Sequence, residues 1–110
     1  MARAANFKSL SKDRQRLVQL MTEVQFGVIA GLHFNGGEPD FSLPPVIYRR
    51  HHFGTNKVHH AAKLRADFVL KAAFVDFFEL CDRLVNFEID ELKVENGLPQ
   101  ALCTVEDAAV

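Results

Sequence analysis

The stretch from Tyr48 to His60, YRRHHFGTNKVHH, concentrates the side chains of this chain that could do chemistry. It holds two arginines, a lysine and four of the chain's five histidines. Such a set could ligate a metal ion, act as a pH switch, contact the phosphates of a nucleic acid, or form an exposed edge strand with a loop. The spacing of the residues decides among these possibilities.

The histidine spacing argues against a metal site. His51 and His52 would point to opposite faces of a strand, and His59 and His60 would diverge on a helix or loop. The sequence has no pair of histidines at helical i, i+4 spacing and no Cys-x₂-Cys pair. We therefore predict no metal and no cofactor, and an edge strand whose arginines discourage pairing with foreign strands.

The sequence also lacks an assembled catalytic motif. Cys81 falls on the apolar stripe of a predicted helix, and Cys103 alternates inward on a predicted strand, so both are expected in the core. No nucleophile elbow, phosphate-binding glycine loop or zinc-protease motif occurs. The acidic residues between Glu88 and Glu95 fit a solvated strand face. We predict that the protein is not an enzyme.

Charge is distributed unevenly along the chain, although the net charge is only −1. Residues 49–71 carry six basic residues and one acid, whereas residues 76–107 carry nine acids and two basic residues. The basic part could face the acidic part of its own chain or that of a second copy, or it could bind a nucleic acid. The leading hypothesis is a non-catalytic interaction module that forms a homodimer through the basic segment 48–65 and meets an anionic surface. The predicted contact residues are Tyr48, Arg49, Arg50, His52, Lys57, Lys63 and Arg65.

The alternative hypothesis is RNA or DNA binding through the same basic segment. The order of one helix, three strands and a second helix, with GTNKVHHAAK before the second helix, resembles in part a double-stranded RNA-binding domain. The resemblance implies phosphate contacts from a glycine-containing loop and a lysine-rich helix start, which Lys57 and Lys63 could supply. The paired lysines of that motif are His59 and His60 here, and a further acidic hairpin follows. The chain is therefore not assigned to that family.

Hydrophobic periodicity predicts the elements that position these residues. Helices are expected over about 10–25 and from 67 to 85, and both should be amphipathic. Strands are expected over 26–34, from 40 toward the break at Pro44-Pro45, over 46–53, over 87–95 and over 99–105. Asn35-Gly36 and Asn96-Gly97 predict tight hairpins, and a slip of the apolar phase predicts a bulge near Asp90 and Glu91.

Shifting the chain by 60 residues aligns the two helices and the hairpins that follow them, which suggests an internal αββ repeat. The predicted fold is an α+β two-layer sandwich of αβββ–αββ order, with both helices on one face of a mostly antiparallel sheet. The charged run KDRQR should lie on the outer side of the first helix, and the uncovered sheet face should carry Ile29, His33, Ile47 and Arg49. The helices should bury Leu17, Met21, Val24, Phe74, Phe77, Cys81 and Leu84.

Length and composition predict one domain over residues 1–110, with flexible ends over 1–8 and 107–110. No apolar run approaches the roughly 20 residues that cross a membrane, and the N-terminus does not have the pattern of a secretory signal. Two cysteines are too few for a disulfide framework. We therefore expect a cytoplasmic protein that does not enter a membrane.

Overall fold

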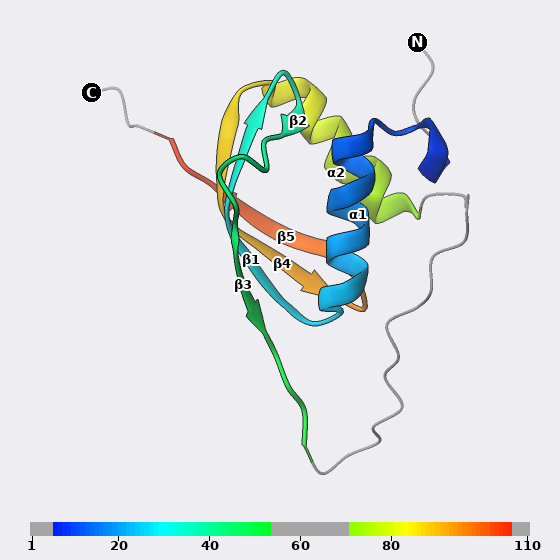
Figure 1. The fold of residues 1–110 in the computed structure, drawn as a ribbon, viewed down its shortest axis with the longest axis vertical. Helices are drawn as coiled ribbons and strands as arrows, with labels where there is room; N and C mark the ends of the chain where they lie inside the picture. The colour runs from blue at the N-terminus through cyan, green and yellow to red at the C-terminus, as the bar shows by residue number, and fades with distance from the viewer. Residues whose placement is uncertain (1–5, 54–70, 107–110) are drawn as a thin grey trace.

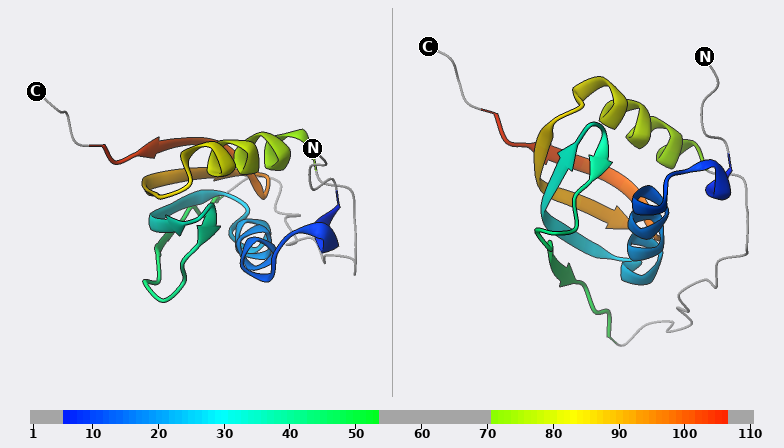
Figure 2. Two further views of the ribbon diagram at one scale, coloured as in Figure 1. Left: turned by 90° about the horizontal axis from the view of Figure 1, so that it is seen from above. Right: turned by 45° about the horizontal axis from the view of Figure 1, so that its top comes forward.

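Two helices pack on one face of a five-stranded antiparallel sheet in the computed structural model, which describes residues 6–53 and 71–106 (Figure 1). The two layers are seen most clearly from above (Figure 2). The predicted α+β sandwich and its element order are confirmed. The elements are η1 (Phe7–Ser9), α1 (Lys12–Val24), β1 (Gly27–Asn35), β2 (Glu38–Pro39), β3 (Val46–Arg49), α2 (Ala72–Leu84), β4 (Phe87–Glu95) and β5 (Leu98–Thr104).

The sheet has the strand order β2-β1-β4-β5, and β3 pairs with β1 along the same edge as β2. The return strand predicted from Asp40 is wrong, because β2 ends at Pro39 and the chain then leaves the sheet until Val46. Asp40 instead closes a turn, in which its carboxylate accepts hydrogen bonds from the amide and hydroxyl of Ser42 at 3.0 and 2.5 Å. These bonds hold the pKa of Asp40 below its usual value.

Each helix ends in the same unusual turn. The Ser11 side chain caps the start of α1 by accepting from the amide of Arg14. At the other end Gln25 has φ 63° and ψ −63°, and the amide of Phe26 donates to the carbonyl of Val24 at 2.7 Å. After α2, Val85 has φ 65° and ψ −71°, and the amide of the residue after it donates a hydrogen bond to the carbonyl of the residue before it. These are strained γ-turns, which an L-residue rarely adopts.

The internal αββ repeat predicted from the sequence is visible in the structure. The bounds of α1 and α2, and those of β1 and β4, are offset by 60 residues. The hairpin of each unit also contacts the helix end of the other. Gly37 donates its amide to the carbonyl of Val85 at 2.7 Å, and Gly97 donates to the carbonyl of Gln25 at 2.9 Å. An approximate two-fold axis between β1 and β4 relates the two units.

The core lies between the helices and the inner face of the sheet. The prediction for Leu84 is wrong, because its side chain is 36% exposed at the end of α2. Phe7, predicted within a flexible end, is buried in this core. The buried apolar residues are Phe7, Leu10, Leu17, Val18, Met21, Val24, Ile29, Leu32, Phe34, Phe74, Phe77, Phe78, Cys81, Ile89, Leu92 and Val94.

A slip in the strand alternation explains why the predicted sheet faces are partly wrong. Gly31 has φ 75° and is skipped in the pairing with β4, so Ile29 joins Leu32 on the inner face. The predicted bulge in β4 is present where Asp90 is skipped between Ile89 and Glu91. The two irregularities lie opposite each other, at the centre of the repeat.

Arg14 is the largest departure from the predicted helix faces. It was expected outside with the rest of KDRQR, but it is buried. Its Nη2 and Nε donate to the carbonyl of Gly37 at 2.7 and 3.2 Å, and Nη2 also contacts Oδ1 of Asp82 at 2.6 Å. The guanidinium lies 4.9 Å from the centre of the Phe78 ring. Arg14 therefore joins α1, the first hairpin and α2.

The thiol of Cys81 gives a pH-dependent prediction. Burial raises its pKa from 9.0 to about 12. Between these values the unfolded chain ionises the thiol while the folded chain keeps it neutral, so folding loses free energy as pH rises. Cys81→Ala removes this loss. We expect its stability deficit relative to the wild type, measured by urea unfolding, to shrink by about 2 kcal/mol between about pH 8 and about pH 10.5.

The matched control for this measurement is Cys103→Ala, because the side chain of Cys103 is exposed. The inward orientation predicted for Cys103 is thus wrong. The stability difference between Cys103→Ala and the wild type should stay constant over the same pH range. A constant deficit for Cys81→Ala as well would contradict the prediction.

Candidate functional site

The face of the sheet opposite the helices is the candidate functional site. We call it the open face, because no element within residues 6–53 and 71–106 packs over it (Figures 1 and 2). Side chains of directly paired residues lie on the same face of a sheet, so the register identifies those of the open face. Val28 pairs with Tyr48 and Lys93, while its neighbour Ile29 is buried on the other side.

Two rows of side chains cross the centre of the open face. In the first row Tyr48, Val28, Lys93 and Ala101 are paired from β3 to β5. In the second row Val46, Ala30, Glu91 and Cys103 are paired in the same order. The rows are therefore apolar or small at both edges, and each contains one charge, of opposite sign, on β4.

The apolar side chains of the open face are well exposed. Tyr48 is 62% exposed, Val46 is 55% exposed and Val105, just beyond β5, is 49% exposed. The amide of Val105 donates to the carbonyl of Glu88, which extends the pairing of β5 with β4 by one residue. Water therefore reaches large apolar groups across the width of the sheet, and covering them would be favourable.

The two ends of the open face differ in charge. At one end Arg50 Nη1 and Lys93 Nζ lie 3.6 and 3.3 Å from a carboxylate oxygen of Glu95, which leaves one net positive charge. Toward the other end Glu88 and Glu91 are paired with His33 and Ala30 on β1. His33 Nδ1 lies 3.9 Å from the Glu88 carboxylate. The face therefore runs from a basic end to an acidic end along its strands.

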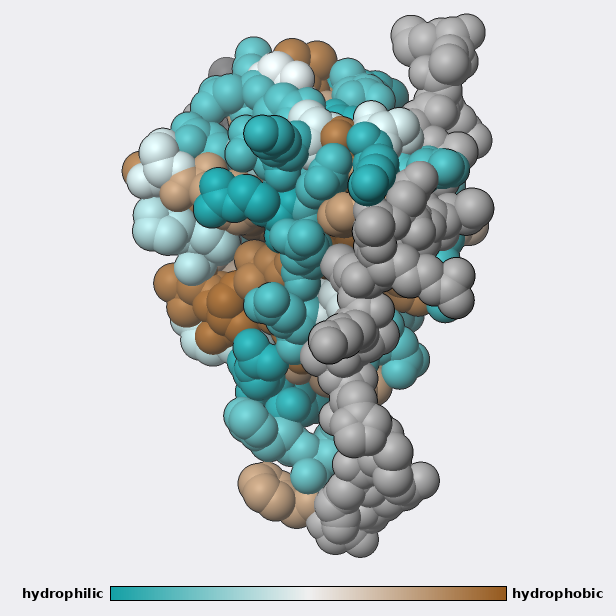
Figure 3. All heavy atoms as spheres, turned by 45° about the vertical axis from the view of Figure 1, so that its right-hand side comes forward, coloured by the Kyte–Doolittle hydropathy of each residue, from teal (hydrophilic) through white to brown (hydrophobic). Residues whose placement is uncertain are grey.

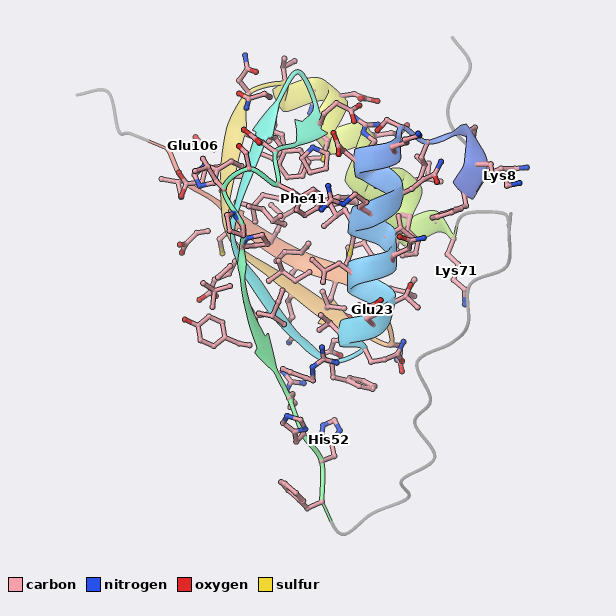
Figure 4. The ribbon with its side chains drawn as sticks, viewed as in Figure 1. Lys8, Glu23, Phe41, His52, Lys71 and Glu106 are labelled. Carbon is pink, nitrogen blue, oxygen red and sulfur yellow. The ribbon has the colours of Figure 1, made fainter. Side chains whose placement is uncertain are left out.

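The predicted contact residues separate into three groups. Tyr48 and Arg50 lie on the open face. Beyond β3, the ring of His52 meets that of Phe26 edge-on, with centroids 5.3 Å apart (Figure 4). Arg49 lies on the helix side, where its Nη1 donates to the carbonyl of Glu23 near the end of α1 at 2.8 Å. The predictions for Lys57, Lys63 and Arg65, and for His59 and His60, fall outside the described residues.

The prediction that Ile47 and Arg49 lie on the uncovered face is wrong, because the alternation of β3 places these two residues on the helix side and Tyr48 on the open face. Ile47 pairs with Ile29 and packs against the core, so its neighbours in β3 point the other way. His33 is on the open face, as predicted. Sequence alternation alone could have found Val46 and Tyr48 had the phase of β3 been fixed by the half-buried Ile47.

Two grooves lie on the helix side, one in each αββ unit. The first has a volume of about 320 Å³ between α1 and the chain from Phe41 to Ile47, and hydrophobic side chains gather on this side of the molecule (Figure 3). Arg16 lies over the Phe41 ring at its rim, 4.6 Å from the ring centre. The second groove has a volume of about 290 Å³ between α2 and β5, with Asp76 at the position that corresponds to Arg16.

Within the described part of the chain, no group of three or more His, Cys, Asp and Glu side chains is placed to hold a metal ion. In the same ranges, no helix is long and apolar enough to span a membrane. The chain matches no protein-family model, no curated protein and no solved structure.

Proposed function

We propose that the protein is a non-catalytic interaction module that forms a homodimer through the open face of its sheet. The observation that carries the proposal is the pair of central rows, which combine exposed apolar edges with opposite charges on β4. Tyr48 and Val46 mark one edge of these rows, and Lys93 and Glu91 mark their centre.

A two-fold axis that crosses the strands between the two rows makes the open face complementary to itself. Such an axis reverses the strand direction, so the first row of one copy covers the second row of its partner. Tyr48 then meets Val46 of the second copy, and Lys93 meets Glu91 of the second copy. The basic end of each face also covers the acidic end of the other.

Two arginines of the predicted contact segment, Arg49 and Arg50, are already engaged by their own chain, which weakens the nucleic-acid alternative. Arg49 is held at the end of α1 and Arg50 lies beside Glu95. Phosphate binding would have to compete with these contacts. Nucleic-acid binding through residues 48–65 therefore remains the second hypothesis.

The free thiols of Cys81 and Cys103 favour a reducing compartment, and we propose that the module is cytoplasmic.

Solution mass measured against protein concentration tests the homodimer. At low salt we expect the wild type to have twice the mass of one chain. Tyr48→Glu should raise the dimer dissociation constant by about 100-fold, because it places a charge against the apolar side chain of Val46 of the second copy. Leu43→Glu is the matched control, since Leu43 is an exposed leucine in the segment between β2 and β3. Its dissociation constant should stay that of the wild type.

A charge exchange on β4 tests the orientation of the two copies. Glu91→Lys alone would place two lysines together across the interface, and Lys93→Glu alone would place two glutamates together. Each single variant should weaken the dimer by about 5-fold, and the double variant should recover most of the wild-type affinity. A single-chain mass for the wild type at low salt, at both pH 6 and pH 7.5, would overturn the proposal.

A further inference from the structure

The two αββ units differ in how their outer sheet edges are closed. In the first unit the chain leaves the sheet after Pro39 and returns at Val46, so residues 40–45 interrupt the outer edge. Phe41 and Pro45 from this part of the chain form one wall of the first groove, and Phe41 points toward α1 (Figure 4). Arg49 adds a charge at this edge, as natural edge strands commonly do.

The second unit lacks these obstacles. β5 is the last strand of the sheet in the described residues, and Ala101, Leu102 and Cys103 pair regularly with β4. The stretch from Leu98 to Val105 contains no charged residue. Pro99 and the extra residue Gln100, which is skipped in the pairing, confine the regular free edge to the stretch that begins at Ala101. The free edge suits a short segment rather than a long strand.

The second groove runs beside this free edge. Phe77, Leu92 and Leu102 are among the residues that line the groove. α2 lies alongside β5 (Figure 2). Asp76 is exposed at the rim. A helix beside an uncharged edge strand, with a groove between them that apolar side chains partly line, is the arrangement that accepts an extended peptide by strand addition.

We propose that β5 and α2 form a binding site for an extended peptide that adds to the sheet as a strand, places an apolar side chain in the groove and presents a basic side chain to Asp76. Main-chain hydrogen bonds to the free edge would supply much of the affinity, and the groove would supply selectivity. The groove lies on the helix side of the sheet, whereas the open face is the opposite side, but β5 contributes residues to both. The test is therefore repeated on a variant in which the homodimer is separated.

The charges of α2 favour a basic peptide over a second copy at this edge. α2 carries Asp76, Glu79 and Asp82 against the single basic residue Arg83. Of these acids, Asp82 already pairs with Arg14, whereas Asp76 is exposed at the groove. Two copies paired through their β5 edges would bring their α2 helices together side by side, with like charges facing. A peptide that brings lysine or arginine to the rim meets attraction instead. The geometry of the edge would admit either occupant, and the charge of α2 favours the basic peptide over a second copy.

The probe is a fluorescent, end-blocked peptide as long as β5, in which leucine and valine alternate with lysine. We expect saturable binding in fluorescence anisotropy, with NMR shift changes centred on the amides from Ala101 to Thr104. A second peptide with proline at its centre, which removes a backbone donor, should bind at least about 10-fold more weakly. Equal binding of the two peptides, or shift changes confined to the first groove, would overturn the proposal.

Charge reversal at the rim supplies the matched variants. Asp76→Lys should weaken the lysine peptide by about 5-fold and strengthen the corresponding glutamate peptide. Arg16→Glu makes the equivalent change at the rim of the first groove and should leave both affinities unchanged. Tyr48→Glu, designed to separate the homodimer, should bind the lysine peptide as the wild type does. No saturable binding to either the wild type or Tyr48→Glu would refute the peptide site and leave the homodimer proposal standing.

Discussion

Replacing Arg14 by alanine should lower the free energy of unfolding by about 3 kcal/mol, the largest loss that we expect from a single charged residue in this protein. The substitution leaves the carbonyl of Gly37 without its two side-chain donors and removes the cation from the Phe78 ring. The side chain of Asp82 is 68% exposed, so its ion pair contributes little to the loss. Denaturant unfolding should show a lower midpoint with an unchanged slope.

Two further variants separate the parts of this effect. Arg14→Lys keeps a positive charge but cannot reproduce two parallel bonds to one carbonyl, so its stability should fall between those of the wild type and Arg14→Ala. Arg16→Ala removes an exposed arginine one half-turn away and should cost less than about 1 kcal/mol. If Arg14→Ala and Arg16→Ala were equally stable, the buried position of Arg14 would be wrong.

Gly27→Ala should be nearly as damaging, at about 3 kcal/mol, and it should act on the candidate site directly. A Cβ atom at Gly27 would lie 2.2 Å from the carbonyl oxygen of Tyr48 and 3.1 Å from the Cα of Arg49. Both neighbours belong to the backbone and cannot rotate away, so β3 must separate from β1. The variant should therefore lose the Arg49 bond to α1 together with the dimer, in unfolding and solution-mass measurements respectively.

Gly36→Ala is the matched control, because it makes the same change where no atom lies within 4 Å. Gly36 has φ 61°, so alanine there costs only the strain of the left-handed conformation, about 1 kcal/mol. The dimer should survive in this variant. Equal stability of Gly27→Ala and Gly36→Ala would show that β3 does not approach β1 as closely as the structure places it.

The sequence predicted those features that depend on local periodicity. Both helices, the hairpin positions, the β4 bulge and the αββ repeat follow from apolar spacing and turn residues close together in the chain. The burial of Arg14 could not be predicted in this way. Its partners Gly37 and Asp82 come from 23 and 68 positions further along the chain, and only the packed structure brings them to one side chain.

The candidate site was predicted only in part for a related reason. The break in alternation at Gly31 changes which residues of β1 face the helices, and the adjacent residues do not predict it. Tyr48 and Arg50 could be predicted from composition. The β4 residues Glu91 and Lys93 could not, because only the strand register places them on the same face as Tyr48 and Arg50. Arg49 was predicted to contact a partner. Its contact with the carbonyl of Glu23 joins residues far apart in the chain, so the sequence could not reveal it.

The reciprocal bonds between the two units have a consequence for how the chain unfolds. The γ-turn carbonyls of Gln25 and Val85 each receive their amide from the glycine turn of the opposite unit. Opening either unit therefore leaves the strained helix end of the other without its hydrogen-bond partner. Unfolding should be cooperative across both halves, and hydrogen exchange of the Gly37 and Gly97 amides should give one common free energy of opening, that of global unfolding.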